Sequence, residues 1–157
     1  MREELQEVHS AIEEAKADIC GLYAIQLLID KEEPVIEKTL EKSFYCTFLA
    51  GCFRSIRFGV HEAHGCGQAL ILNFLLNEGG FEFDEKKRKY SVNFGKVKES
   101  VKKLASEILT LQAEGSKEKA KKMIERFAVV SGHVAESLES VSKNNIPVDI
   151  RLVFPQI

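Results

Sequence analysis

Hydrophobic residues recur at helical spacing in the first part of the chain. From position 8 to 22 they fall every three or four residues, at Val8, Ile12, Ala15, Ile19 and Leu22, and the pattern resumes at Ile29 after the polar Gln26. This period predicts a helix over residues 3–29 with one buried face. A second helix is predicted over residues 35–58, because Pro34 suits the first turn of a helix and Gly59 follows the run. Its segment 44–53 is almost entirely apolar, so this helix is expected to be central.

The pattern then changes from helix to strand and back. A third helix is predicted over 61–77, ended by the glycine pair at 79–80. Alternating aromatic and polar residues at 81–83 and 90–94 flank the polar stretch DEKKRK, which predicts a short β-hairpin with a solvated basic tip. Helical spacing resumes over residues 96–113.

Two further helices and a terminal strand complete the expected fold. Ser116 is placed to cap a helix that runs towards residue 127, and another helix is expected around residues 134–141. Residues 148–154 alternate between two prolines, as in a terminal strand. The predicted fold class is therefore mainly α: a helical bundle of five to six helices with a small β-hairpin and a C-terminal extended strand, in a single domain over residues 1–157.

Composition narrows the classes of function. The chain has 157 residues, of which 45% are hydrophobic and 29% are charged, as in a soluble globular protein. Its net charge of −2 argues against a nucleic-acid partner, and its apolar runs are too short to cross a membrane. The first residues lack the apolar segment of a signal peptide, which favours a cytoplasmic location with reduced, mostly buried cysteines.

An acidic pair on the first predicted helix is a candidate site. Glu14 and Asp18 lie one helical turn apart on the same face, where like charges repel. An exposed stripe screened by Lys16 and solvent would explain them without any function. The small residues Ala17 and Gly21 beside them favour the alternative, in which sheltered carboxylates meet a cation or a protonated histidine.

The segment HEAHG at 61–65 resembles a zinc-peptidase motif in composition but not in spacing. His61 and His64 are three residues apart instead of four, so the HExxH metal geometry is not reproduced. A histidine that faces substrate or simply solvent is the preferred interpretation of His64, while a metal site built from His61, His64, Cys66 and an acid remains an alternative. His9 and His133 are expected to be surface or capping histidines.

Several segments together resemble the C-terminal part of the dipeptidyl peptidase III family of zinc metallopeptidases and related bacterial zinc hydrolases. The segments are EEAKADICGLY, LAGCFRSIRFGVHEAHGCGQA, the aromatic hairpin and the closing helices. The most specific, EEAKAD, is similar to the family's EExxA[ED] motif, which supplies the third zinc ligand. The second, EAHGCGQA, is similar to a helix whose histidine contacts substrate.

The resemblance implies a role for each matching residue. Glu14 would be the zinc ligand, and Asp18 would orient a histidine ligand from the second coordination shell. His64 would stabilise the bound peptide or the tetrahedral intermediate, and Glu13 would lie beside the site without an assigned role. The family's HExxGH motif, which carries two zinc-binding histidines and the catalytic glutamate, does not occur in these 157 residues.

A catalytic zinc needs three protein ligands and a base for its water, and this chain offers one ligand. It is therefore expected to resemble the C-terminal fragment of a larger enzyme, to bind zinc only with the missing upstream segment, and to be inactive alone. Its expected partners are a peptide substrate in the complete enzyme and the upstream catalytic segment or a second copy, with no nucleic acid and no membrane. The alternative function is a non-catalytic helical interaction module.

Overall fold

The chain is mainly helical in the computed structural model, which describes residues 2–130, 132–149 and 153–154. Six longer helices follow one another along the chain: α2 (His9–Ile29), α3 (Glu41–Ile56), α4 (Ala63–Asn77), α5 (Val97–Ala113), α6 (Lys117–Phe127) and α7 (Gly132–Lys143). A short helix α1 (Arg2–Leu5) precedes them, and an antiparallel hairpin of β1 (Phe81–Asp84) and β2 (Lys89–Val92) separates α4 from α5. The predicted helical bundle with a small hairpin is confirmed.

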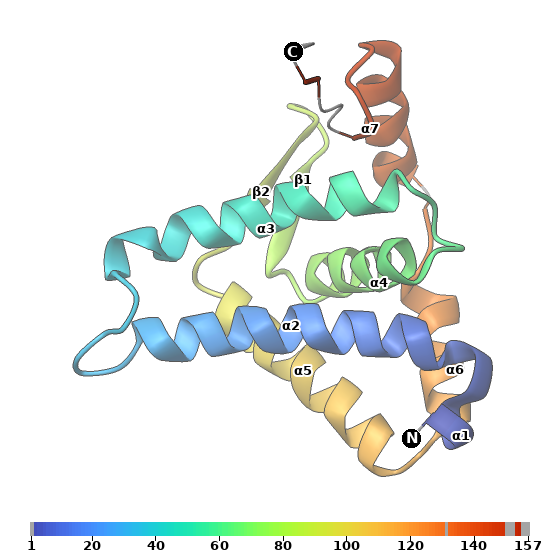
Figure 1. The fold of residues 1–157 in the computed structure, drawn as a ribbon. Coiled ribbons are helices and arrows are strands. Elements are labelled where there is room, and N and C mark those ends of the chain that lie inside the picture. Colours follow the sequence, from blue (N-terminus) through green and yellow to red (C-terminus); the bar gives the residue numbers. More distant parts are fainter. Residues whose placement is uncertain (1, 131, 150–152, 155–157) are drawn as a thin grey trace.

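The helices are arranged around α4 (Figure 1). α2 and α3 run in opposite directions and are joined by a loop at the left-hand end of the view, while α5 crosses below α2. α4 packs against α2 and α3, and also against α5, α6 and β1. The hairpin and α7 lie at the opposite side of α3 from α2 (Figure 1).

The prediction that the second helix is central was wrong. In α3 only one face is buried, at Tyr45, Leu49, Cys52 and Ile56. α4 is buried along most of its length instead, from Gly65 to Leu72 and again at Phe74 and Leu75. The apolar run at 44–53 misled the prediction, because most of its residues outside that face are small or half-buried and leave α3 on the outside.

The predicted start of this helix was also wrong. Residues after Pro34 form bends, and a 3-10 turn at Lys38–Leu40 leads into α3 at Glu41. Glu41 is held there by two donors, since Gln26 Nε2 lies 3.0 Å and Lys98 Nζ lies 2.5 Å from its Oε1. The beginning of α3 is therefore fixed by contacts with α2 and α5, which the local sequence does not reveal.

Other helix ends follow the local sequence. Gly79 and Gly115 have φ of +75° and +63°, the left-handed conformation that ends helices and favours glycine. Ser116 caps α6 as predicted, its side chain accepting a hydrogen bond from the Lys119 amide.

The C-terminal tail lies only in part within the described structure. Residues 150–152 and 155–157, on which much of the predicted terminal strand falls, lie outside the described residues. Residues 146–149 form irregular structure and bends beside α3, where Arg54 pairs with Asp149 at 2.7 Å and Arg57 donates to the carbonyl of Pro147 at 2.8 Å.

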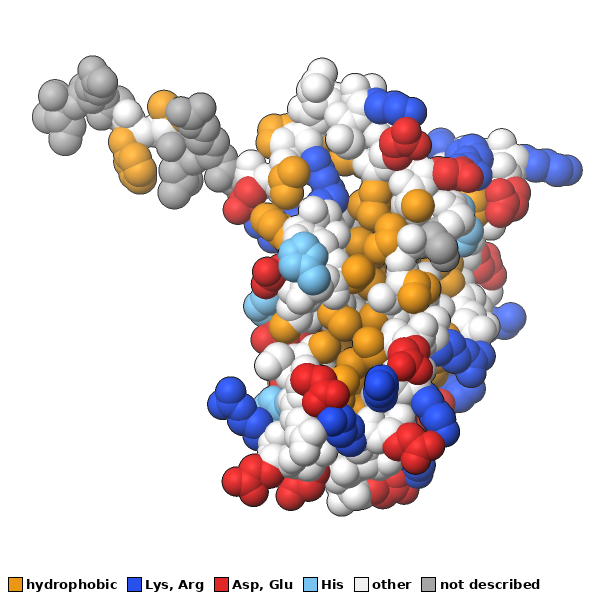
Figure 2. Space-filling model, turned by 90° about the vertical axis from the view of Figure 1, so that its right-hand side faces the viewer, with side chains coloured by type: hydrophobic (Ala, Val, Ile, Leu, Met, Phe, Trp, Pro, Cys, Tyr) orange, Lys and Arg blue, Asp and Glu red, His pale blue; other side chains and the backbone are white. Residues whose placement is uncertain are grey.

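The side of the molecule that carries α6 and α7 shows a vertical band of hydrophobic side chains between charged ones (Figure 2). Within the described ranges, no helix is long and apolar enough to span a bilayer.

Candidate functional site

The acidic pair of α2 faces α4. Oε2 of Glu14 lies 2.9 Å from Nδ1 of His64, the second residue of α4. The Glu14 side chain is 33% exposed and that of His64 is 75% exposed, so this contact lies at the surface. Oε1 of Glu14 makes no hydrogen bond or ion pair with the residues that the structure describes, and remains available to a cation.

A second contact lies one helical turn further along both helices. Nε2 of Gln68 donates to Oδ2 of Asp18 at 2.5 Å, and the Gln68 residue is only 8% exposed. Glu14 and Asp18 are four residues apart, as are His64 and Gln68, so the two helices meet through two successive polar pairs. The outer pair is open to solvent and the inner pair is largely sheltered.

Asp18 also affects the protein interior. Burial raises the pKa of the Cys52 thiol on α3, and the nearby Asp18 carboxylate raises it further. The Asp18 carboxylate therefore lies close enough to the core to raise the pKa of a fully buried thiol. Its hydrogen bond from Gln68 offsets part of the cost of keeping a charge there.

Two glycines of α4 allow this close approach. A Cβ atom at Gly67 would lie 3.0 Å from the Ala15 amide nitrogen and 3.3 Å from Cβ of Glu14. A Cβ atom at Gly65 would lie 2.1 Å from the carbonyl oxygen of Gly59, in the connection between α3 and α4. The sequence suggested that these glycines permit a close approach, and α2 and the α3–α4 connection are what approaches.

Glu13 points to another part of the molecule. Gln112 of α5 donates to its Oε1 at 2.5 Å, and Lys16 lies 2.6 Å from its Oε2. The hydrogen bond from Lys16 lowers the pKa of Glu13, and the bond from Gln112 adds to the effect. Glu13 thus links α2 to α5, whereas Glu14 faces His64.

The small residues beyond the acidic pair are exposed. Ala17, Gly21 and Ala24 are open to solvent, and Ile25 is half-buried. A Cβ atom at Gly21 would meet nothing within 4 Å. The stripe therefore leaves a free surface along α2, and the acidic pair lies where this surface meets α4.

The alternative metal site at His61, His64 and Cys66 is not assembled. Cys66 is 8% exposed and faces the interior, whereas the His61 side chain is 79% exposed and lies over Gly59. No group of three or more His, Cys, Asp or Glu residues in the described part of the chain is placed to hold a metal ion. A zinc ion bound at Glu14 would accordingly need ligands from other polypeptide.

The expectation for His133 as a surface or capping histidine was wrong. Its Nδ1 lies 2.7 Å from the Tyr90 hydroxyl, and its ring stacks on Phe83 with centroids 4.2 Å apart. It therefore joins α7 to the hairpin. His9 lies at the start of α2 with Nε2 3.9 Å from Oε1 of Glu13.

Sequence reasoning missed Gln68 as a member of the site. The available signal was its spacing, since Gln68 follows His64 by one helical turn in the same way that Asp18 follows Glu14. Glutamine is usually exposed, so a buried glutamine beside a carboxylate is informative only after the helices have been placed.

Comparisons with known proteins match nearly the whole chain. The chain is 48% identical over 155 residues to Nudix hydrolase 3 of Arabidopsis thaliana, covering 99% of this chain and 20% of that protein. It matches the solved structure of DPP III from Caldithrix abyssi with a TM-score of 0.89 and 44% identity, over 95% of this chain and 28% of the other. No protein-family model matches the sequence.

A second solved structure gives the same result. Dipeptidyl-peptidase III from Corallococcus sp. strain EGB matches with a TM-score of 0.89 and 43% identity, over 96% of this chain and 27% of that one. The chain thus spans about a fifth of the curated relative and little more than a quarter of each solved structure. It has the fold of the corresponding part of dipeptidyl peptidase III.

Proposed function

We propose that this chain is the part of a dipeptidyl peptidase III-like zinc hydrolase that supplies the third zinc ligand, Glu14, and a substrate-contacting histidine, His64. Asp18 orients a histidine ligand, and the two zinc-binding histidines and the catalytic glutamate come from an HExxGH segment outside these 157 residues. A bound zinc ion would polarise a peptide carbonyl and activate a water molecule for its hydrolysis. The chain alone is inactive and binds zinc weakly.

The observation that carries this proposal is the pair of successive contacts between α2 and α4. Glu14 and Asp18 are presented on one face, with His64 2.9 Å from the first and Gln68 2.5 Å from the second. Carboxylate oxygen is a normal zinc ligand, and Oε1 of Glu14 is available for that role. His64, on the exposed side of the same contact, can donate a hydrogen bond to a developing oxyanion or to a peptide carbonyl.

Gln68 and Gly67 position these groups. Gly67 lets α4 approach the backbone of α2 closely, and Gln68 holds one oxygen of Asp18. The other oxygen of Asp18 can then accept a hydrogen bond from the ring N–H of a histidine ligand, an interaction that metal-bound imidazoles commonly make. Glu13, engaged with α5, has no part in zinc binding in this proposal.

A chimera tests the proposal directly. This chain would replace the matching segment of the Caldithrix abyssi enzyme, and the purified chimera would be assayed for bound zinc and for release of dipeptides from a peptide substrate. The chimera should bind zinc and hydrolyse peptide, Glu14→Ala should lose the metal, and Asp18→Ala should weaken zinc binding roughly 10- to 100-fold. Glu13→Ala and Glu107→Ala, on the α5 side, should retain the metal.

His64→Ala separates the two roles within the site. It should retain zinc and lose peptide hydrolysis, because His64 acts on the substrate and not on the metal. A folded chimera that binds zinc equally well with Glu14→Ala would refute the assignment. Loss of zinc in His64→Ala would assign that histidine to the metal instead.

The helical interaction module remains the second candidate, because α2 and α3 together present an uncharged outer surface. Under that function the chimera would fold without binding zinc, and Glu14→Ala would change neither its metal content nor its stability. The Arabidopsis relative is named a Nudix hydrolase, whereas the two solved structures are named dipeptidyl peptidase III. The proposed peptide substrate therefore rests on the two solved structures.

A further inference from the structure

A cluster of polar side chains lies where α2 ends and where α3 and α5 begin. Two carboxylates converge there on one ammonium group, since Nζ of Lys98 lies 3.2 Å from Oδ1 of Asp30 and 2.5 Å from Oε1 of Glu41. Nε2 of Gln26 lies 2.9 Å and 3.0 Å from the same two oxygens. Two like charges are therefore held close together, an arrangement that a cation between them stabilises.

Two buried oxygen atoms in this cluster have no hydrogen-bond partner. Gln26 is 4% exposed and Tyr45 is fully buried, yet neither Oε1 of Gln26 nor the Tyr45 hydroxyl is hydrogen-bonded within the part of the chain that the structure describes. Burial raises the pKa of Tyr45, and the charges of Glu41 and Asp30 raise it further, so the hydroxyl lies close to both carboxylates. Leaving buried oxygens unpaired costs free energy, which a bound ligand would offset.

The donors of this cluster match those of a calcium site. They are two carboxylates, one amide carbonyl and one phenol, and all are oxygens: Asp30, Glu41, Gln26 and Tyr45. Oxygen donors favour Ca²⁺ over zinc or copper, and Ca²⁺ tolerates irregular coordination geometry better than Mg²⁺ does. Only two of the four residues are acidic, so the cluster contains no group of three His, Cys, Asp or Glu residues.

Lys98 and Gln26 can both make room for the ion. The Lys98 side chain is partly exposed, so its ammonium group can turn to solvent when a divalent cation takes its place between the carboxylates. Turning the Gln26 amide about its last carbon–carbon bond would exchange Nε2 for Oε1 and bring the unpaired oxygen to the ion. The two carboxylates would then neutralise the charge of Ca²⁺.

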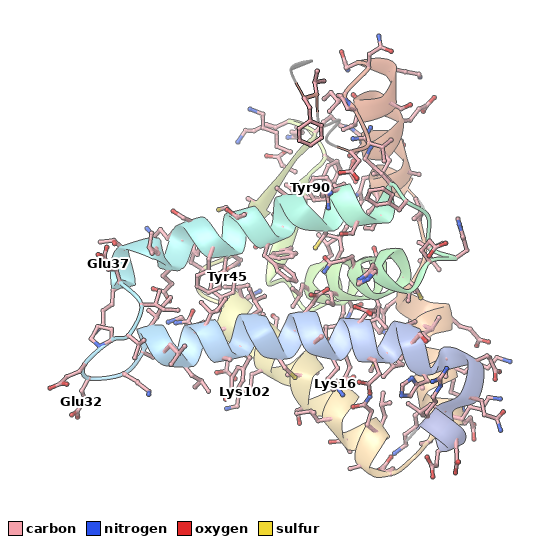
Figure 3. The ribbon with its side chains drawn as sticks, in the orientation of Figure 1. Lys16, Glu32, Glu37, Tyr45, Tyr90 and Lys102 are labelled. Atoms are coloured by element: carbon pink, nitrogen blue, oxygen red, sulfur yellow. The ribbon has the colours of Figure 1, made fainter. Side chains whose placement is uncertain are left out.

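The surrounding segment is acidic and open to solvent. Residues 30–41 carry more carboxylates than lysines: Asp30, Glu32, Glu33, Glu37 and Glu41 against Lys31 and Lys38. Glu32 and Glu37 lie in the loop that joins α2 to α3, and Tyr45 lies on α3 near the same end of the molecule (Figure 3). A local excess of negative charge attracts cations, and the partly exposed carboxylates of Asp30 and Glu41 leave a path for the ion to enter.

We infer that Gln26, Asp30, Glu41 and Tyr45 form a binding site for a calcium ion, which displaces the ammonium group of Lys98. The inference does not rest on the proposed function. The site lies at the end of α2, about 18 Å along the helix axis from the nearer member of the acidic pair that faces α4. A bound ion would join the end of α2 to the start of α3 more firmly than Lys98 does.

Terbium luminescence tests the position of the ion, because the chain has three tyrosines and no tryptophan. Tb³⁺ binds at calcium sites and emits light when a neighbouring tyrosine is excited. Emission from the isolated chain should rise to saturation with added Tb³⁺, and Ca²⁺ should reduce it. Tyr45→Phe should remove most of the emission, whereas Tyr23→Phe and Tyr90→Phe should retain it. Circular dichroism would confirm that each variant is folded.

Charge substitutions test the ligands and the competing lysine, with Ca²⁺ binding measured by titration calorimetry. Asp30→Asn should weaken binding at least about tenfold, because calcium affinity depends on the number of charged ligands. Glu37→Gln removes a carboxylate from the same loop but outside the cluster, and should change the affinity less than about twofold. Lys98→Met should strengthen binding about tenfold, because Ca²⁺ no longer has to displace an ammonium group.

Three results would overturn the inference. The first is equal affinity of the parent and Lys98→Met for Ca²⁺, or no saturable binding by either. The second is sensitised emission that survives Tyr45→Phe, because the ion would then lie elsewhere in the acidic loop. The third is loss of Ca²⁺ binding in Glu14→Ala, which would place the ion at the acidic pair. Zinc binding by the chimera is measured separately, so either proposal can fail without the other.

Discussion

The two sides of α2 use small residues in opposite ways. On the side that packs against α4, Ala15 is fully buried, and a Cβ atom at Gly67 would lie 3.0 Å from its amide nitrogen. On the outer side, Ala17 is exposed, and a Cβ atom at Gly21 would meet nothing within 4 Å. The same residue types thus form a close-packed helix contact on one side and an open surface on the other.

This difference explains where the polar groups are placed. Close packing on the inner side brings Gln68 within reach of Asp18, so a carboxylate near the core obtains a donor. The outer side of α2 carries no charged residue between Asp18 and Asp30. Glu14 lies at the boundary between the two sides, with one oxygen at His64 and the other without a hydrogen bond or ion pair to the residues that the structure describes.

The largest effect is expected from a methyl group on the packed side. Gly65→Ala places a Cβ atom 2.1 Å from the carbonyl oxygen of Gly59, so α4 and its connection to α3 must move apart. The free energy of unfolding should fall by about 3 kcal/mol, in urea denaturation at neutral pH, despite the better helix propensity of alanine. Gly51→Ala, where a Cβ meets nothing within 4 Å, is the control and should not destabilise the chain.

The polar pair on the packed side, Gln68 and Asp18, should contribute less to the free energy of unfolding. Gln68→Ala leaves the sheltered Asp18 carboxylate without its donor and should cost about 2 kcal/mol. A double-mutant cycle with Asp18→Ala, measured by urea denaturation, should give a coupling energy of about 1 kcal/mol. Additive effects of the two substitutions would mean that the contact between α2 and α4 is held by packing alone.

The two sides of α3 should differ in their response to alkaline pH. Burial, with the Asp18 charge, raises the pKa of Cys52 above the ordinary value of 9.0, so the folded state keeps a proton that the unfolded state releases. The resulting stability is complete below about pH 9 and is lost as the pH rises further. Between about pH 9 and 10 this thiol alone should lower the free energy of unfolding by roughly 1 kcal/mol.

Cys52→Ala should therefore reduce the alkaline decline in stability, measured by urea denaturation at several pH values. The pKa of Tyr45 is also raised by burial, so Tyr45 should still cause a decline in stability at higher pH in this variant. Cys46→Ala removes an exposed thiol from the same helix and should leave the decline unchanged. An identical pH profile for Cys52→Ala and the parent would contradict the buried position of this thiol.

The sequence predicts helices better than it predicts their partners. The spacing of apolar residues located α4, α5 and the end of α2 closely, because each buries one periodic face or a long apolar run. The predicted continuous helix from residue 3 was wrong at its start, where a 3-10 turn at Gln6–Val8 separates α1 from α2. It did not locate the start of α3, which depends on Gln26 and Lys98 reaching Glu41 from other helices. It also could not distinguish an apolar run in the centre of the bundle from one on its surface.

The site was predictable to a similar extent. Spacing alone placed Glu14 and Asp18 on one face, and the glycines after His64 indicated a close approach. Predicting that α4 approaches α2 requires knowing how the two helices pack. The same holds for predicting that Gln68 donates to Asp18. The roles of Glu14, Asp18 and His64 at a zinc ion stay predictions until the chimera is measured.

The smallest effect is expected on the open side. Gly21→Ala adds a methyl group that meets no atom within 4 Å, while alanine favours the helix more than glycine does. The isolated chain should gain about 0.5–1 kcal/mol in free energy of unfolding, measured by urea denaturation. A loss of stability would contradict the open position of Gly21, because it would mean that the added methyl group meets a neighbouring atom.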